Sequence, residues 1–178
     1  MMKNSSRIKL ETERFILREV LLTDVDAFFE LDSNPEVQKY VGNTRVVTKS
    51  EIINRIENLQ KQYAANGIAR WAVIEKESDA FVGWAGFKWI TEPINNQLHF
   101  HELGYRFLET HWGKGIATET SRSLIAYAFA NLTTDSLYAI CDCENLNSRK
   151  VLEKVGFQWK EVFIHDGIPH HWFYIHNN

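Results

Sequence analysis

Two glycines one residue apart, Gly113 and Gly115, restrict how the middle of this chain folds. Upstream of them, residues 98–108 are rich in aromatic and apolar side chains, which is typical of a strand. Downstream, small and apolar residues recur every four positions, as on one face of a helix: Ile116, Thr120, Leu124 and Ala128. The sequence therefore predicts a strand, a glycine-containing turn and a helix.

Such a turn has the chemistry of a phosphate or pyrophosphate site. Glycine lets the backbone approach a ligand without interference from a Cβ atom. The first turn of the following helix offers N–H groups that have no partner within the helix and a partial positive charge. Lys114 adds a mobile positive charge beside them. Glycine pairs also occur in tight connections that bind nothing, so the assignment depends on the rest of the chain.

The length and composition favour one globular domain, for which we expect residues 8–177 after an N-terminal extension of residues 1–7. The chain has 178 residues, of which 44% are hydrophobic and 13% aromatic, enough for a substantial core. Its formal net charge of -3 gives no broad basic character and disfavours direct nucleic-acid binding. No run is long enough to span a bilayer, and no apolar segment follows the basic residues Lys3 and Arg7. We expect a cytoplasmic protein with no membrane partner.

The pattern along the chain predicts strand, two helices, three strands, helix, strand, helix and two strands. Thr48 and Glu51 form a capping-box pattern that starts the second helix, Asn66-Gly67 ends that helix, and Pro35 ends the first. The expected strands are 14–20, 70–76, 81–89, 98–108, 136–143, 157–164 and 170–176, and the expected helices are 24–31, 49–66, 116–131 and 145–155. Hairpins flank a central strand–helix–strand unit, which requires a parallel pair of strands. We expect a mixed α/β fold with a mostly antiparallel sheet and helices on both faces.

Three segments of the chain resemble one known family. Residues 111–119, His-Trp-Gly-Lys-Gly-Ile-Ala-Thr-Glu, resemble the acetyl-CoA pyrophosphate loop of the GNAT N-acetyltransferases. Residues 145–157, which begin Asn-Leu-Asn-Ser-Arg-Lys, resemble the second signature of that family. Residues 10–18, Leu-Glu-Thr-Glu-Arg-Phe-Ile-Leu-Arg, are similar to the start of its RimJ/RimL-like branch, which acetylates the N-termini of ribosomal proteins. The resemblance covers almost the whole chain and implies a GNAT-like sheet of about six or seven strands with a splayed parallel pair.

The resemblance also implies which residues bind acetyl-CoA as co-substrate. They are Trp112, Gly113, Lys114, Gly115, Ile116, Ala117 and Thr118 in the loop, Leu103, Gly104 and Tyr105 in the preceding strand, and Asn145, Asn147 and Lys150 in the later helix. Backbone N–H groups of residues 103–105 would polarise the thioester carbonyl, with Gly104 at a bulge that splays the strand. Two alternatives stay open, because Asn145 is also a suitable helix cap and Lys150 a solvated helix lysine.

Two positions depart from the family pattern. Trp112 stands where the family often has Gln or Arg, which removes one side-chain contact to phosphate. Leu152 stands where many members have a Tyr that protonates the leaving thiolate. Ser148 is our candidate for the missing acid, because the resemblance places the start of this helix near the coenzyme sulfur.

Acetyl transfer to an amine requires a group that accepts the proton of the arriving ammonium. Glu102 is our candidate for this base, directly or through water, because RimJ/RimL-like members similarly place a Glu in this strand. The alternatives for Glu102 are an ion pair with Arg106 or simple solvation. His101 is an alternative base, since its unperturbed pKa near 6.5 suits proton transfer at neutral pH.

The remaining reactive residues do not suggest other chemistry. Cys141 and Cys143 point to opposite faces of a strand, so we expect reduced packing residues rather than a disulfide or a covalent nucleophile. The pairs His99/His101 and His170/His171 lack an evident third ligand, so no metal is expected. We therefore expect direct transfer in a ternary complex.

Several questions stay open at the level of sequence. A CoA-binding sensor that has lost turnover is the alternative that Leu152 suggests, and a nucleotide-binding protein is disfavoured because the P-loop spacing is absent. The acceptor is an N-terminal amine of ribosomal-protein type, a polyamine, an antibiotic or another small amine. Loops 34–48 and 91–97 are expected to shape its pocket. A monomer and a homodimer are both compatible with the sequence.

Overall fold

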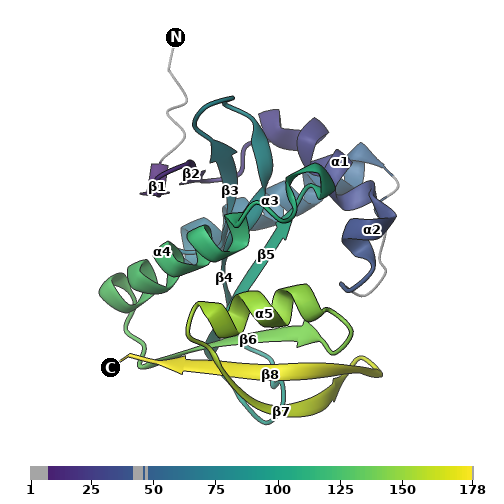
Figure 1. Cartoon of the computed structure of the whole chain (residues 1–178). Coiled ribbons are helices and arrows are strands. Elements are labelled where there is room, and N and C mark those ends of the chain that lie inside the picture. The colour runs from purple at the N-terminus through teal and green to yellow at the C-terminus, as the bar shows by residue number, and fades with distance from the viewer. Residues whose placement is uncertain (1–7, 42–45, 47, 178) are drawn as a thin grey trace.

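The fold is a single twisted sheet with helices on both of its faces, as seen in a computed structural model (Figure 1). The structure describes residues 8–41, 46 and 48–177; the expected N-terminal extension and part of the 34–48 loop lie outside these ranges. Within them the sheet has eight strands in the order β1-β2-β3-β4-β5-β6-β8-β7. The strands are β1 (Ile8–Glu11), β2 (Phe15–Arg18), β3 (Arg70–Glu75), β4 (Phe81–Ile90), β5 (Phe100–Phe107), β6 (Ser136–Asp142), β7 (Gln158–His165) and β8 (Ile168–His176).

Four of the five helices in the described ranges begin and end close to the expected residues, and α2 (Pro35–Gln38) lies where a loop is expected. The other helices are α1 (Val25–Ser33), α3 (Lys49–Asn66), α4 (Ile116–Asn131) and α5 (Leu146–Lys154), with short 3₁₀ turns at Leu22–Asp24 and Glu109–His111. The capping box of Thr48 and Glu51 is confirmed at the start of α3, and Gly67 ends that helix with φ +69°. Pro35 does end α1, and it also starts α2, because proline fits the first turn of a helix. None of the described helices combines the length and the apolar character needed to cross a bilayer.

The two larger of the three hydrophobic clusters in the described residues lie on opposite faces of the sheet, because neighbouring residues of a strand point in opposite directions. On one face α4 and α5 cover Trp71, Val73, Ala85, Phe87 and Leu103. On the other face α1, α2 and α3 cover Ala72, Ile74 and Trp84. In Figure 1, α4 and α5 lie in front of the sheet and α3 passes behind it. A ligand that bridges the two faces must therefore pass through the sheet or around its edge.

The parallel pair sits in the middle of the sheet, as expected, and it is splayed. Within the described chain, β5 and β6 share one pair of partner residues, Glu102 and Tyr138, whereas all other neighbouring strands pair antiparallel over longer runs. The predicted bulge at Gly104 is wrong, because β5 pairs with β4 without a register shift from Phe100 to Phe107. The splay arises instead on the other side of β5, where β6 diverges.

The prediction of the sheet missed one strand. Residues 8–11 form β1, which turns back through a hydrogen bond from the Thr12 N–H to the Phe15 carbonyl, 2.9 Å. This strand has only four residues, too few for an alternating pattern to be recognised. The sheet is therefore one strand larger than the upper expectation, with the same mixed topology.

Candidate active site

The start of α4 lacks the side-chain cap that is found at the starts of α3 and α5. Gly113 and Gly115 have φ values of +74° and +76°, and Gly115 precedes the helix with no side chain to cap it. The first helical hydrogen bond of α4 joins the Glu119 N–H to the Gly115 carbonyl, so the N–H groups of residues 116–118 have no acceptor within the helix. In contrast, the Thr48 hydroxyl caps α3 and the Asn145 carboxamide caps α5. The start of α4 is therefore open to an anion.

Glu119 fixes the first turn of α4 against the N-terminal strands. Its carboxylate accepts hydrogen bonds from the Thr12 hydroxyl (2.7 Å), the Arg14 backbone N–H (2.9 Å) and the Arg14 Nε (2.7 Å). Burial acts to raise the pKa of this carboxyl, but the hydrogen bonds from Thr12 and Arg14 outweigh it and lower the pKa. Two of the segments that resemble the GNAT family thus contact each other, which no sequence pattern predicted.

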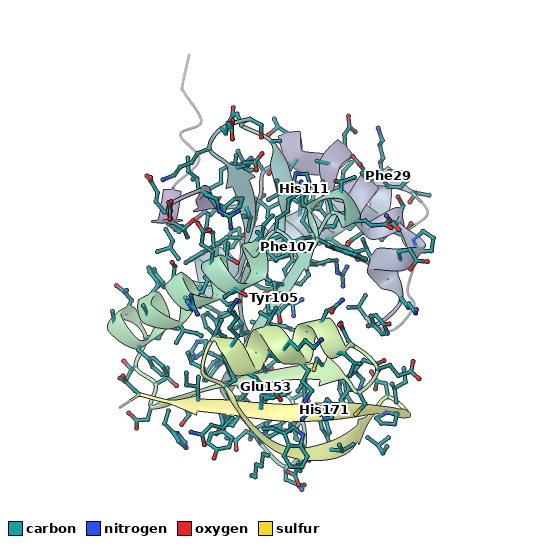
Figure 2. All side chains as sticks on the ribbon, in the orientation of Figure 1. Phe29, Tyr105, Phe107, His111, Glu153 and His171 are labelled. Atoms are coloured by element: carbon teal, nitrogen blue, oxygen red, sulfur yellow. The ribbon has the colours of Figure 1, made fainter. Side chains whose placement is uncertain are left out.

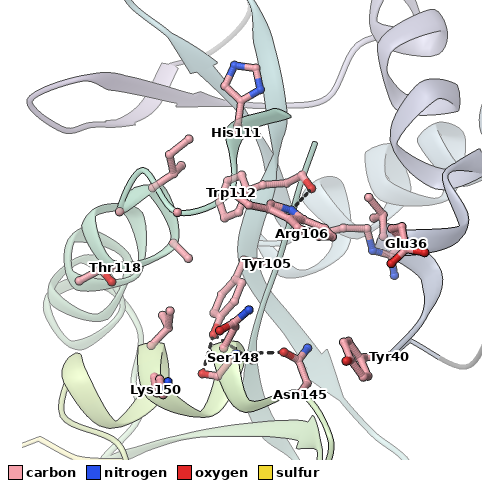
Figure 3. A pocket seen from close by; sticks show the side chains of 18 of the residues that line it. Glu36, Tyr40, Tyr105, Arg106, His111, Trp112, Thr118, Asn145, Ser148 and Lys150 are labelled. Carbon is pink, nitrogen blue, oxygen red and sulfur yellow. Dashed lines mark hydrogen bonds between the residues drawn. The ribbon is translucent and has the colours of Figure 1, made fainter. Parts of the chain in front are cut away.

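A cavity of about 390 Å³ opens beside the start of α4 (Figure 3). Most of the expected coenzyme-binding residues line it: Tyr105, Trp112, Gly113, Gly115, Ile116, Ala117, Thr118, Asn145, Asn147 and Lys150. The candidate acid Ser148 also lines this cavity. Lys114 does not line it, and Leu103 and Gly104 line a second cavity instead. We refer to the first as the α4 cavity.

Trp112 contributes an aromatic wall to the α4 cavity rather than a ligand for phosphate. Its indole N–H donates to the Phe107 carbonyl at 2.8 Å, and 47% of the residue is exposed. The ring is therefore held in place while about half of the residue stays exposed (Figure 3).

The Tyr105 phenol lies beside Ser148, which the sequence alone identified as the candidate acid. The Tyr105 hydroxyl lies 3.0 Å from the Ser148 Oγ and 3.2 Å from the Ser148 carbonyl oxygen. Figures 2 and 3 show the Tyr105 side chain reaching from β5 toward α5. Burial raises the pKa of the Tyr105 phenol, and its hydrogen bond with Ser148 opposes that rise only in part. Leu152 is 2% exposed and belongs to the core, so it contributes no polar group.

The two cysteines are free thiols, as expected. Cys141 is buried and lines the second cavity, whereas Cys143 is half-buried. Burial raises the pKa of the Cys141 thiol to about 12, against the effect of a hydrogen bond with Ser148. A thiol with this pKa is not ionised at neutral pH, which fits the expectation that neither cysteine is a nucleophile.

The second cavity, of about 240 Å³, lies where β5 and β6 separate, and we call it the splay cavity. Its lining includes Arg70, Trp84, Glu102, Gly104, Asp142 and His170. It shares Tyr40, Val41, Tyr105, Arg106, Asn145 and Ser148 with the α4 cavity, so the two are adjacent. Since Glu102 and Tyr105 belong to opposite faces of β5, a group in one cavity can meet a group in the other only at the splay.

Glu102 lies at the splay with a single loose partner among the described residues. Its carboxylate is 13% exposed and lies 3.6 Å from the Arg70 Nη2, which is an ion pair but longer than a hydrogen bond. The alternative partner, Arg106, forms its ion pair with Asp32. Glu102 therefore keeps most of its hydrogen-bonding capacity for a ligand.

His101, the alternative base, lines neither cavity. Its ring packs against Trp89, with 4.6 Å between ring centroids, and against Phe87. Burial lowers its pKa. Within the described ranges, no group of three or more His, Cys, Asp and Glu side chains is placed to hold a metal ion.

Of the two loops expected to shape the acceptor pocket, one lies at the cavities. Glu36, Val37, Tyr40 and Val41, from the first part of the 34–48 loop, line the α4 cavity. The 91–97 loop lines neither cavity. It closes on itself through a bridge between Ile94 and Gln97.

Comparisons with known proteins agree with this geometry. The family described as acetyltransferase (GNAT) domain matches residues 14–158. The protein named "Uncharacterized N-acetyltransferase p20" of Bacillus licheniformis is 36% identical over 160 residues, covering 88% of this chain and 85% of that protein. An acetyltransferase (GNAT family) from Bacillus anthracis has a similar fold, with a TM-score of 0.78, 24% identity and coverage of 94% and 97%. RimL, a ribosomal L7/L12 alpha-N-protein acetyltransferase solved in complex with coenzyme A, has a TM-score of 0.79 at 17% identity, with coverage of 95% and 97%.

Proposed function

The chain belongs to the acetyltransferase (GNAT) family, and we propose that it transfers the acetyl group of acetyl-CoA to a primary amine by direct attack in a ternary complex. The observation that supports this most is the uncapped start of α4, which opens on a cavity adjacent to a second cavity that contains Glu102. The acceptor is the N-terminal amine of a protein or a small amine.

The residues of the α4 cavity fit coenzyme A. The N–H groups of residues 116–118 have no acceptor in the helix and would bind the pyrophosphate, as anions bind at helix starts. Adding a Cβ to Gly113 would meet no atom within 4 Å, so the turn has open space beside its backbone. Acetyl-CoA supplies the thioester, and the splay between β5 and β6 is where its acetyl end would meet an amine.

Glu102 would act as the base on the acceptor side. An amine that arrives protonated loses a proton to the Glu102 carboxylate, directly or through water, and its nitrogen then bonds to the thioester carbon while the carbon–sulfur bond breaks. The Glu102 carboxylate is 13% exposed, and its distance of 3.6 Å from the Arg70 Nη2 leaves it able to accept a proton from the amine.

Ser148 and Tyr105 would act on the leaving sulfur. A raised pKa keeps the Tyr105 phenol protonated, so it donates a hydrogen bond to the Ser148 Oγ or carbonyl. The Ser148 hydroxyl, which also has a hydrogen bond with the Cys141 thiol, would then turn to donate to the sulfur that leaves. Tyr105, on β5, would thus supply part of the proton-donating function that Leu152 cannot provide. Asn145 caps α5 through its Oδ1, which accepts from the Ser148 N–H at 3.0 Å, and so orients this hydroxyl.

An acceptor screen tests the proposal. The protein is incubated with acetyl-CoA and a panel of peptides and small amines, thiol release is followed, and products are identified by mass. Calorimetry with coenzyme A is run in parallel. We expect binding and an N-acetylated product. Binding without thiol release on any acceptor would favour a CoA-binding sensor, and the absence of binding would overturn both.

A further inference from the structure

An arginine-rich cluster covers the acceptor side of the splay. Arg70 and Arg106 both line the splay cavity, and both guanidinium groups lie over the ring of Trp84, at 4.6 and 5.2 Å from its centroid. These residues come from β3, β5 and β4 and share the sheet face that α1 to α3 cover, as Glu102 does. The cluster therefore lies on the acceptor side of β5, opposite Tyr105.

The hydrogen-bonding capacity of Arg70 is almost unused by the protein. Its guanidinium has one ion-pair partner in the described chain, Glu102 at 3.6 Å, and its Nε is buried with no hydrogen-bond partner there. A guanidinium has five N–H donors, and burying them without partners costs free energy. The side chain is 29% exposed, so part of the guanidinium faces the cavity.

The absence of a Cβ atom at Gly104 leaves room for the Arg70 guanidinium. A Cβ at this position would lie 3.1 Å from the Arg70 Nη2 and 3.3 Å from its Nε. Only glycine lets the guanidinium lie this close to β5. The glycine that the sequence suggested as a bulge thus serves to place a positive charge beside the candidate base.

Ion pairs link the arginines of this cluster to two carboxylates. Asp32, which is 1% exposed, pairs with both Arg106 and Arg55, and Glu102 is the one carboxylate beside Arg70 in the described chain. Burial lowers the pKa of Arg106, Asp32 acts against this, and Arg70 and Arg55 lower it further by repulsion. Three guanidinium groups of this cluster thus share two carboxylates, Asp32 and Glu102, and a third carboxylate, Asp142, lines the cavity from β6.

Asp142 and His170 also line the cavity, and each already has a hydrogen-bond partner. Asp142 lies on β6 across the splay, and its Oδ1 accepts the Glu144 N–H. The His170 Nδ1 is paired with the Ile168 carbonyl. The positive charge of Arg70 therefore lies on the β3 and β5 side next to the Glu102 carboxylate, and the Asp142 carboxylate adds negative charge across the splay.

We propose that the acceptor is a small zwitterion, an amine that also has a carboxylate, and that Arg70 binds this carboxylate while Glu102 receives the amine. This inference rests on the proposed acetyl transfer and specifies its acceptor. A cavity in which a cation and an anion lie 3.6 Å apart without a hydrogen bond is complementary to a ligand with the opposite pair of charges. Arg106, beside Arg70 over Trp84, adds to the positive field at that end.

The size of the splay cavity favours a ligand comparable to an amino acid. Its volume of about 240 Å³ lies below the range of about 300–1,000 Å³ typical of sites for drug-sized ligands. A free amino acid or a similar ω-amino acid fits this volume. The acidic N-terminus of a peptide has the same pair of charges and is the second source that the experiment distinguishes.

The experiment compares acceptors that differ in one carboxylate. Amino acids, including β-alanine and glutamate, are assayed beside their carboxamides, with each rate referred to the fraction of unprotonated amine. Peptides that begin with Asp are assayed beside peptides that begin with Asn. We expect kcat/KM for the free amino acids to exceed that for their carboxamides by about tenfold or more, and to exceed that for both peptide sets.

Variants of Arg70 identify the group responsible. Arg70→Gln should lower kcat/KM for the amino acids about tenfold, leave the carboxamides within about twofold, and leave the Kd of coenzyme A unchanged. Arg70→Lys should restore part of the preference. Arg122→Gln is the matched control, because Arg122 is exposed on α4 and lines neither cavity.

The outcomes separate this inference from the proposed function. Equal rates for acids and carboxamides, or a preference that survives Arg70→Gln, would overturn the zwitterion while acetyl transfer stands. A preference confined to Asp peptides would move the acceptor to a protein N-terminus and overturn the small-molecule assignment. If no acceptor is acetylated, calorimetry of the same amino acids in the presence of coenzyme A decides: binding that Arg70→Gln abolishes supports the charged subsite, and no binding overturns it.

Discussion

The two cavities on either side of β5 differ in the kinds of groups that line them. The α4 cavity is lined by glycines, the exposed backbone at the start of α4 and hydroxyl groups, together with the side chains of Glu36, Lys150 and Arg106, the last of which lines both cavities. The splay cavity is lined by ionised side chains, Arg70, Glu102 and Arg106, from strands that are distant in the sequence. Coenzyme A would therefore be bound mainly by local backbone geometry, and the acceptor by charges that the tertiary structure brings together.

The largest expected effect is at the charged cavity. Glu102→Gln removes the candidate base and should lower kcat about 100-fold or more, because general-base catalysis typically contributes 10²–10⁴-fold. The Kd of coenzyme A should not change, since Glu102 does not line the α4 cavity. Stopped-flow or steady-state kinetics and calorimetry measure the two quantities. The control is Glu57→Gln, on the exposed side of α3; a pH–rate profile that Glu102→Gln leaves unchanged would defeat the assignment of the base.

A comparable effect is expected at the backbone cavity, but on binding. Gly115→Asp places a carboxylate and a strained φ of +76° beside the open N–H groups, and should weaken coenzyme A binding about 100-fold. Gly67→Asp is the matched control, because Gly67 has φ +69° at the end of α3 and a Cβ there would meet no atom within 4 Å. If both variants bind coenzyme A equally well, the start of α4 is not the pyrophosphate site.

Variants of Tyr105 and Ser148, which line both cavities, test whether their hydroxyls act together on the leaving sulfur. Tyr105→Phe and Ser148→Ala should each lower kcat about tenfold, which corresponds to one hydrogen bond. The double variant should lose little more than either single one, because the two hydroxyls act in one chain. Rapid-quench or steady-state kinetics of the four proteins supply the cycle. Strictly additive losses would show that the hydroxyls act independently.

Gly104→Ala tests the placement of Arg70 with a small change. The added Cβ would lie 3.1 Å from the Arg70 Nη2 and displace this flexible side chain. The KM of a carboxylate-bearing acceptor should rise about threefold, with the Kd of coenzyme A unchanged. A rise of equal size for carboxamide acceptors would indicate a general distortion of β5 instead.

The smallest effect is expected for Asn145→Ala. Loss of the cap on α5 should lower the free energy of unfolding by about 1 kcal/mol, measured by denaturant titration. The Kd of coenzyme A should stay within about twofold, because the Asn145 Oδ1 already accepts from the Ser148 N–H. A large loss of coenzyme binding without loss of stability would make Asn145 a coenzyme ligand rather than a cap.

Most of the fold could be predicted because its signals are local. The capping box at Thr48, the glycine that ends α3 and the turn at Gly113 each depend on a few neighbouring residues. Three expectations about the fold differ from the structure. Pro35–Gln38 forms α2, although a loop is expected after Pro35. The four residues of β1 are too few to show a period. Gly104 was assigned to a bulge because a glycine within a strand indicates either a bulge or a close approach, and only the position of Arg70 distinguishes them.

The sequence by itself determined the glycine turn, the helix that follows it and the family to which the chain belongs, because these depend on the order of adjacent residues. Tertiary structure decided which charges meet. Arg70 precedes Glu102 by more than thirty residues and Asp32 precedes Arg106 by more than seventy, yet each pair is in contact. The sequence shows which residues are charged, but the pairing of strands and the packing of α1 onto the sheet determine which of those charges are left for a ligand.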